Sequence, residues 1–161
     1  MFEEFMGIPA HPLLVHAAVV FVPLLALLAI AYAFVPAVRR HTRWVLGLLA
    51  VGAPLAALAA KLSGDAFFAR MNARDAITEG FYPTIDNHRD LGTLTLYAAV
   101  VLGLLTLALV FLVAPAGGTA VVRTGALPIA LGVLVAVASA ASLYYVIRTG
   151  DSGAKAVWTG Q

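Results

Sequence analysis

Three of the four histidines stand at the heads of hydrophobic runs, where they could bind a metal or exchange a proton. His11 and His16 begin the first run, His88 begins the third, and a carboxylate, Asp65, follows the second. Imidazole nitrogens bind haem iron, zinc and copper, and an imidazole beside a carboxylate can exchange protons near neutral pH. These four residues form the candidate site.

The first chemistry that fits is haem b, which needs one or two axial histidines on different helices and small residues beside the ring. His16 and His88 meet the first requirement, and Gly92, Ala99 and Gly103 could make room for the macrocycle. We therefore predict His16 and His88 as the cofactor-binding pair.

The second chemistry is a zinc or copper ion held by His11, His16, His88 and Asp65, because imidazole suits both metals. The third is a proton or quinone site that uses the same groups as acid and base. No HExxH, P-loop or GxSxG motif selects one of them. We therefore do not expect a stand-alone enzyme.

Each residue also has a structural interpretation without a ligand. His11 could cap the first helix, and His16 could bond a neighbouring carbonyl group. Asp65 follows a Ser-Gly pair and could be the N-cap of a short helix. His88 could be an interfacial residue at a helix start, and His41 falls on the opposite membrane face.

The spacing of His11 and His16 limits how they could cooperate. Five residues of helix correspond to about 7.5 Å of rise and roughly 140° of rotation, so two helical positions would not share a face. His11 precedes Pro12. We therefore expect His11 to lie just outside the helix, where it could fold back toward the site.

The composition indicates a protein whose solvent is the bilayer. Hydrophobic residues make up 62% of the 161 residues and charged residues only 11%, against about 25% charged in soluble domains. The chain has no cysteine, which excludes disulfides, thiolate metal sites and covalently attached c-type haem. The small positive net charge of +2 does not indicate nucleic-acid binding.

Four apolar runs are long enough to cross a hydrocarbon core of about 30 Å as helices. We expect spans over residues 12–35, 45–62, 89–113 and 125–147, in a single domain covering residues 1–161. Between the second and third spans, residues 65–74 mix aromatic and charged side chains and indicate a short interfacial helix. Residues 148–161 are polar, and we expect them to fray.

The charges predict the orientation. The two short connections, residues 36–44 and 114–124, contain Arg39, Arg40, Arg43 and Arg123 and none of the eight acidic residues. Under the positive-inside rule this predicts a protein with both termini outside and the candidate site at the outer face.

Three segments resemble a known family. Residues 7–16 (GIPAHPLLVH), residues 63–65 (SGD) and residues 88–92 (HRDLG) are similar to the bacterial four-span membrane family catalogued as domain of unknown function 2231. The resemblance covers nearly the whole chain. Ala17-Ala18 departs from the aromatic residue and proline that usually follow the second histidine of the motif. The resemblance implies a four-helix membrane protein with His11, His16 and His88 as characteristic polar residues, and some relatives look joined to redox modules.

Together these features predict an all-α, integral membrane four-helix bundle in a bacterial cytoplasmic membrane. We expect a haem b or metal-binding redox component at its outer face, acting beside a larger membrane redox complex or as a homo-oligomer. The alternative is a cofactor-free structural or assembly subunit, in which Gly132, Ala136 and Ala140 form a docking face for a partner helix.

Overall fold

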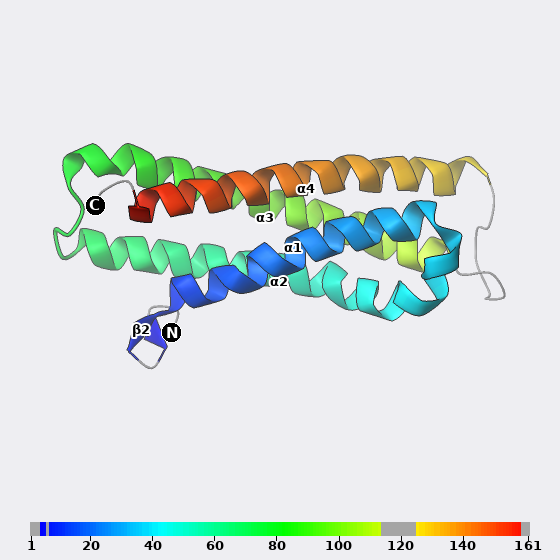
Figure 1. Cartoon of the computed structure of the whole chain (residues 1–161), viewed down its shortest axis with the longest axis horizontal. Helices are drawn as coiled ribbons and strands as arrows, with labels where there is room; N and C mark the ends of the chain where they lie inside the picture. The colour runs from blue at the N-terminus through cyan, green and yellow to red at the C-terminus, as the bar shows by residue number, and fades with distance from the viewer. Residues whose placement is uncertain (1–3, 6, 114–124, 159–161) are drawn as a thin grey trace.

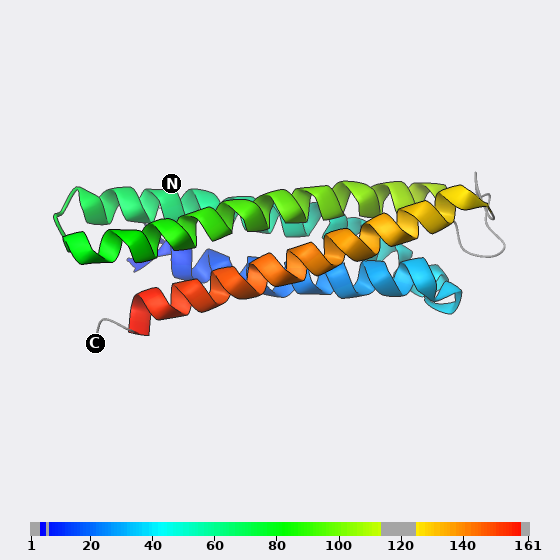
Figure 2. The same cartoon turned by 90° about the horizontal axis from the view of Figure 1, so that it is seen from above.

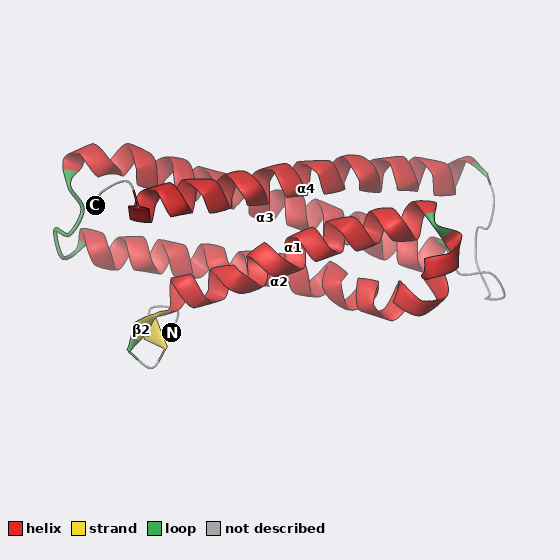
Figure 3. Cartoon of the chain, viewed as in Figure 1, coloured by secondary structure: helices red, strands yellow, loops and turns green. Residues whose placement is uncertain are grey.

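The computed structural model is a bundle of four long helices (Figures 1 and 3). It describes residues 4–5, 7–113 and 125–158. The helices are α1 (Ala10–Phe34), α2 (Arg39–Asn72), α3 (Tyr82–Leu112) and α4 (Ala126–Trp158). All four are long and apolar enough to cross a membrane. The predicted all-α fold with four spans is confirmed.

Short elements connect and precede the helices. β1 (Glu4–Phe5) and β2 (Ile8–Pro9) pair antiparallel immediately before α1. The 3-10 turn η1 (Pro36–Val38) joins α1 to α2, and η2 (Glu79–Phe81) leads into α3. The α1–α2 connection is therefore tight, and α1 and α2 form an antiparallel hairpin.

The four helices alternate in direction, and each packs against two neighbours around the bundle. The neighbouring pairs are α1–α2, α2–α3, α3–α4 and α1–α4. Viewed from above, α4 runs beside α3 at an oblique angle and diverges from it toward the C-terminus (Figure 2). As a result, the start of α1, the end of α2, the start of α3 and the end of α4 lie together at one end (Figure 1).

Three helices are longer than a bilayer requires. At about 1.5 Å per residue, α2 (34 residues) and α4 (33 residues) each extend about 50 Å, whereas the hydrocarbon core is about 30 Å thick. The polar excess lies at one end, in residues 61–72 of α2, 82–90 of α3 and 148–158 of α4. We call these residues, with the first turn of α1, the histidine end.

Two expectations about the histidine end were wrong in detail. Residues 65–74 do not begin a separate interfacial helix, because α2 continues without a break to Asn72. Residues 148–158 are not frayed but form the last turns of α4. In both helices an i,i+4 ion pair supports the polar extension: Lys61 with Asp65, and Asp151 with Lys155.

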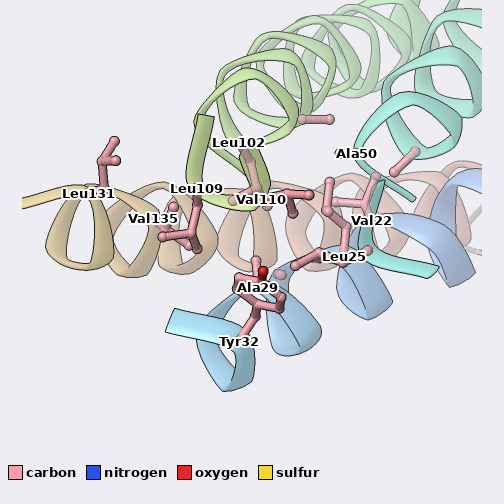
Figure 4. Packing of buried hydrophobic residues seen from close by; sticks show 14 of the residues in the cluster. Val22, Leu25, Ala29, Tyr32, Ala50, Leu102, Leu109, Val110, Leu131 and Val135 are labelled. Atoms are coloured by element: carbon pink, nitrogen blue, oxygen red, sulfur yellow. The ribbon is translucent and has the colours of Figure 1, made fainter. Parts of the chain in front are cut away.

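The core lies in the apolar half of the bundle, where all four helices contribute side chains. Leu25 and Tyr32 of α1, Leu102 of α3 and Val135 of α4 are fully or almost fully buried (Figure 4). At Gly103 the helices α2 and α3 approach closely, because a Cβ added there would lie 2.4 Å from the Ala50 carbonyl oxygen. Gly103 is therefore committed to helix packing, and the prediction that it would make room for a haem is wrong.

At the end opposite the histidines, Arg39 and Tyr32 form hydrogen bonds that join the ends of the helices. The Arg39 guanidinium donates to the Tyr32 and Ala33 carbonyl groups at the end of α1, at 2.8 and 2.7 Å. The Tyr32 hydroxyl donates to the Val113 carbonyl oxygen at 2.9 Å and joins α1 to the end of α3. The predicted basic turn at residues 36–44 lies here, while Arg123 and the loop at residues 114–118 are outside the described residues.

Candidate functional site

His11 is the second residue of α1 and packs against α2. It lies inside the helix, and the expectation that it would precede the helix was wrong. Its Nδ1 is 3.0 Å from the Ala60 carbonyl oxygen and 3.1 Å from Ser63 Oγ. Because a carbonyl oxygen can only accept, this geometry assigns the proton of neutral His11 to Nδ1. The Ser63 hydroxyl in turn donates to the Ala60 carbonyl at 2.9 Å.

The ring of His11 fills the space where Gly64 lacks a side chain. A Cβ added at Gly64 would lie 3.0 Å from Cε1 of His11, which is closer than nearly all real Cβ contacts. On another side the ring stacks with Phe67, with centroids 6.4 Å apart and planes 20° apart. The α2 backbone and one aromatic ring therefore hold the imidazole in place.

His88 repeats this arrangement between α3 and α4. Its Nδ1 is 3.0 Å from Ser152 Oγ, and the Ser152 hydroxyl donates to the Thr149 carbonyl at 2.9 Å. Because the Ser152 hydroxyl proton is used in that bond, its oxygen accepts a hydrogen bond from the ring. A Cβ added at Gly153 would lie 2.9 Å from Cε1 of His88. The proton of His88 is therefore again on Nδ1.

Each helical hairpin thus contains one histidine–serine–glycine unit. The first unit is His11, Ser63 and Gly64, and the second is His88, Ser152 and Gly153. In each, the serine bonds the carbonyl three residues before it, the histidine bonds the serine, and the next residue is a glycine under the ring. The bundle therefore has an approximate internal twofold arrangement around this end.

The two imidazole rings approach each other edge to face between the two helical hairpins. Their centroids are 6.2 Å apart and their planes are 73° apart. Within the described part of the chain, Nε2 of neither His11 nor His88 makes a hydrogen bond. Both histidines therefore keep the nitrogen lone pair that a metal would use, and their Nδ1–H groups are already bonded in the way that orients metal-ligating histidines.

Asp65 lies at the predicted height but bonds to basic side chains. It pairs with Lys61 and, at 3.4 Å, with Arg89. The Arg89 guanidinium also lies 4.3 Å over the Phe68 ring. The interpretation of Asp65 as an N-cap was wrong, because the residue is inside α2. The ion pair between Asp65 and Arg89 joins α2 to α3 near the histidine pair.

His16 is exposed and bonds within its own turn. Its Nδ1 lies 2.6 Å from the Pro12 carbonyl oxygen. Because His11 and His16 are both helical, the rotation of about 140° between them turns one inward and the other outward. No group of three or more His, Asp or Glu side chains in the described ranges could together hold a metal ion. The structure therefore brings His11 and His88 together, but not His16 or Asp65.

Sequence reasoning missed both serines and both glycines as parts of the site. Ser63 and Gly64 were noted only as part of a family motif, and Ser152 and Gly153 fell in the tail that was expected to fray. A usable signal was present: a Ser-Gly pair lies beside an i,i+4 acid–base pair in both α2 and α4.

Comparison with known proteins places the chain in a family. Residues 7–161 match the family described as predicted membrane protein, DUF2231. The chain belongs to the DUF2231 family. No curated protein and no solved structure matches it. The matched DUF2231 region includes both histidine–serine–glycine units, so the resemblance at the three quoted segments is confirmed over almost the whole chain.

Proposed function

We propose that this DUF2231 protein binds one redox-active metal centre between His11 and His88, and that it transfers electrons beside a larger membrane redox complex. The shared chemistry is a transition-metal ion bound by two imidazole Nε2 atoms. Haem b iron and copper both fit that description. His11 replaces His16 as the partner of His88 in this proposal, because His16 is exposed on the outside of the bundle.

The separation of the two rings is the observation that carries the proposal. With metal–nitrogen bonds of about 2.0–2.1 Å, two imidazoles that share one ion would place their centroids about 5–6.5 Å apart. The centroids of His11 and His88 are 6.2 Å apart. The separation is therefore compatible with one ion that both imidazoles would hold and that would supply one-electron redox chemistry.

The number of ligands favours haem or copper over zinc. A structural zinc site takes four protein ligands, and a catalytic one takes three. Only two imidazoles meet here among the described residues. Haem iron needs no more than two from the protein, because the macrocycle supplies the other four nitrogens. His11 and His88 would hold the metal, and Ser63 and Ser152 would orient them.

The charges support an outward-facing site in a bacterial cytoplasmic membrane. The short α1–α2 connection with Arg39, Arg40 and Arg43 lies at the end opposite the histidines. Basic residues in short connections mark the cytoplasmic side. The histidine end would then face the extracytoplasmic space, where a partner could reach the metal centre.

The decisive experiment is a visible spectrum of the detergent-purified protein, oxidised and dithionite-reduced, with metal analysis of the same sample. We expect either a Soret band with sharp reduced α and β bands, which identifies haem, or about one copper per chain. His11→Ala and His88→Ala should each lose the bound metal. His41→Ala, at the opposite end of the bundle, is the matched control and should retain it.

Full metal retention in both variants, or a well-folded protein without haem or copper after purification under conditions that preserve cofactors, would overturn the proposal. Zinc in stoichiometric amount would also contradict the electron-transfer role, because zinc has no redox chemistry. Substitution by alanine could destabilise the bundle, so circular dichroism and thermal unfolding accompany each variant.

A second candidate function is a cofactor-free assembly subunit. The observation that favours it is that each histidine already joins the two helices of its own hairpin, His11 in α1–α2 and His88 in α3–α4. The proposed docking face is only partly available, because Gly132 is buried while Ala140 is exposed. A membrane complex that survives both histidine substitutions would support this candidate.

A further inference from the structure

A groove of about 390 Å³ lies between α3 and α4 at the histidine end. Its lining includes Thr84 and Asn87 of α3, and Arg148 and Lys155 of α4, with apolar contributions from Pro83 and Leu91. We propose that this groove binds the phosphate headgroup of an anionic phospholipid. Asp151 and Ser152 complete the lining, and Ser152 also bonds His88. The proposal rests on Arg148 and the polar side chains of α3, and it does not require a bound metal.

The position of the groove matches the boundary between lipid and water. Leu91 begins the apolar run of α3, and Arg148 directly follows Ile147, the last residue of the apolar run of α4. Tyr144, one turn earlier, is 54% exposed on the outside of the bundle, and aromatic side chains in such positions mark the interface. The groove therefore begins at headgroup height and extends away from the hydrocarbon.

The charge of the groove favours an anion. Lys155 and Asp151 pair at 2.8 Å and largely offset each other. Arg148 forms no ion pair with any residue that the structure describes, and its guanidinium lies 5.9 Å from the Tyr144 ring. One uncompensated guanidinium at the membrane surface attracts a lipid phosphate.

The first turns of α3 add to the positive potential of the groove. Thr84 and Asn87 are close to the N-terminus of α3, where no side chain makes a capping hydrogen bond. A helix N-terminus carries partial positive charge and binds phosphate groups readily. The Thr84 hydroxyl and the Asn87 amide supply further donors. An acyl chain attached to the phosphate could run along the lipid-facing side of Leu91.

The test is binding of short-chain phosphatidylglycerol to the detergent-purified full-length protein, followed by mass spectrometry of the intact complex. Phosphatidylcholine and inorganic phosphate are compared at equal concentration. We expect saturable binding of phosphatidylglycerol, weaker by about fivefold in Arg148→Gln. Arg74→Gln removes an exposed cation from the same end but outside the groove, and it should bind as the unchanged protein does.

A second variant, Asn87→Leu, removes an exposed donor from the groove and should also weaken binding. Equal binding by the unchanged protein, Arg148→Gln and Asn87→Leu would overturn the proposal. Equal affinity for phosphatidylcholine would overturn it too, because that headgroup carries no net charge. Saturation by inorganic phosphate with no gain from the lipid would assign the groove to a free anion and contradict the lipid assignment.

Discussion

The two histidine–serine–glycine units make the same hydrogen bonds in different surroundings. The His11 unit is enclosed, since Ser63 is fully buried and Phe67 stacks on the imidazole. The His88 unit borders the open groove, because Ser152 contributes to its lining. No aromatic ring in the described residues other than His11 itself contacts His88.

This difference suggests a division of roles in the proposed centre. The enclosed half holds its imidazole by packing as well as by hydrogen bonds. The half beside the groove relies on Ser152 and the α4 backbone, and it lies next to the place where we propose a lipid headgroup. The following predictions test whether the units are equivalent in binding metal and unequal in packing.

The largest effect is expected from alanine at Gly64 or Gly153. The added Cβ would lie 3.0 or 2.9 Å from an imidazole carbon, so the ring must move. The displaced ring should lower metal affinity by more than about tenfold. Alanine is more favourable than glycine inside a helix by up to about 1 kcal/mol, so we expect the thermal midpoint to hold or rise. Gly150→Ala, whose Cβ meets open space, is the control. Identical affinities in all three variants would refute ring displacement.

Ser63→Ala and Ser152→Ala should each weaken metal binding by about tenfold, which is the lower end of the range for residues that orient a metal ligand. Both serines bond Nδ1 of their histidine, at 3.1 and 3.0 Å. Metal titration of the two variants measures the effect. Ser139→Ala, a buried α4 serine without a bond in the described structure, is the control. A loss in only one variant would show that the units differ in function.

Phe67→Leu should affect only the enclosed half. The phenyl ring stacks on His11, and such a contact is worth about 0.5–1.5 kcal/mol, so we expect an affinity lower by about threefold. Phe68→Leu removes the neighbouring ring, which packs under Arg89, and should leave metal affinity unchanged. A larger loss of metal affinity in Phe68→Leu than in Phe67→Leu would contradict the assignment of Phe67 as the ring that positions His11.

His16→Ala should have the smallest effect, with metal content and spectrum unchanged. The side chain is exposed and bonds only to the Pro12 carbonyl oxygen within the described structure. The comparison with His11→Ala, in the same turn and a half of α1, is made by metal analysis of both variants. Metal loss from His16→Ala would show that His16 does contribute to the metal site.

The apolar runs predicted the spans, because hydropathy over about 20 residues reports burial in lipid directly. They could not predict where α2 and α4 end. Residues 63–72 and 148–158 are polar, and their helicity depends on packing against other helices. Gly64 and Gly153 are unfavourable in isolated helices, yet both lie inside one here, with an imidazole packed against them.

The end of the bundle at which the candidate site residues lie was predictable, but their rotation about the helix axis was not. Hydropathy placed His11, His16, His88 and Asp65 at one end of the bundle. Whether a side chain faces the bundle or the lipid depends on how helices pack, which one sequence does not specify. For Ser152, which orients His88, the only signal in the sequence is the Ser-Gly pair beside Asp151 and Lys155, and that pair does not show which way the side chain faces.

Gly64 and Gly153 have a further consequence for the electron transfer that we propose. Each imidazole rests on helix backbone, which has no rotamers, and is bonded through Nδ1 to a buried serine. Neither ring can tilt far without losing a hydrogen bond or colliding with the main chain. Ligands held in this way change position little when a metal gains or loses an electron. The reorganisation energy would therefore be small, and electrons could pass quickly even between partners of similar potential.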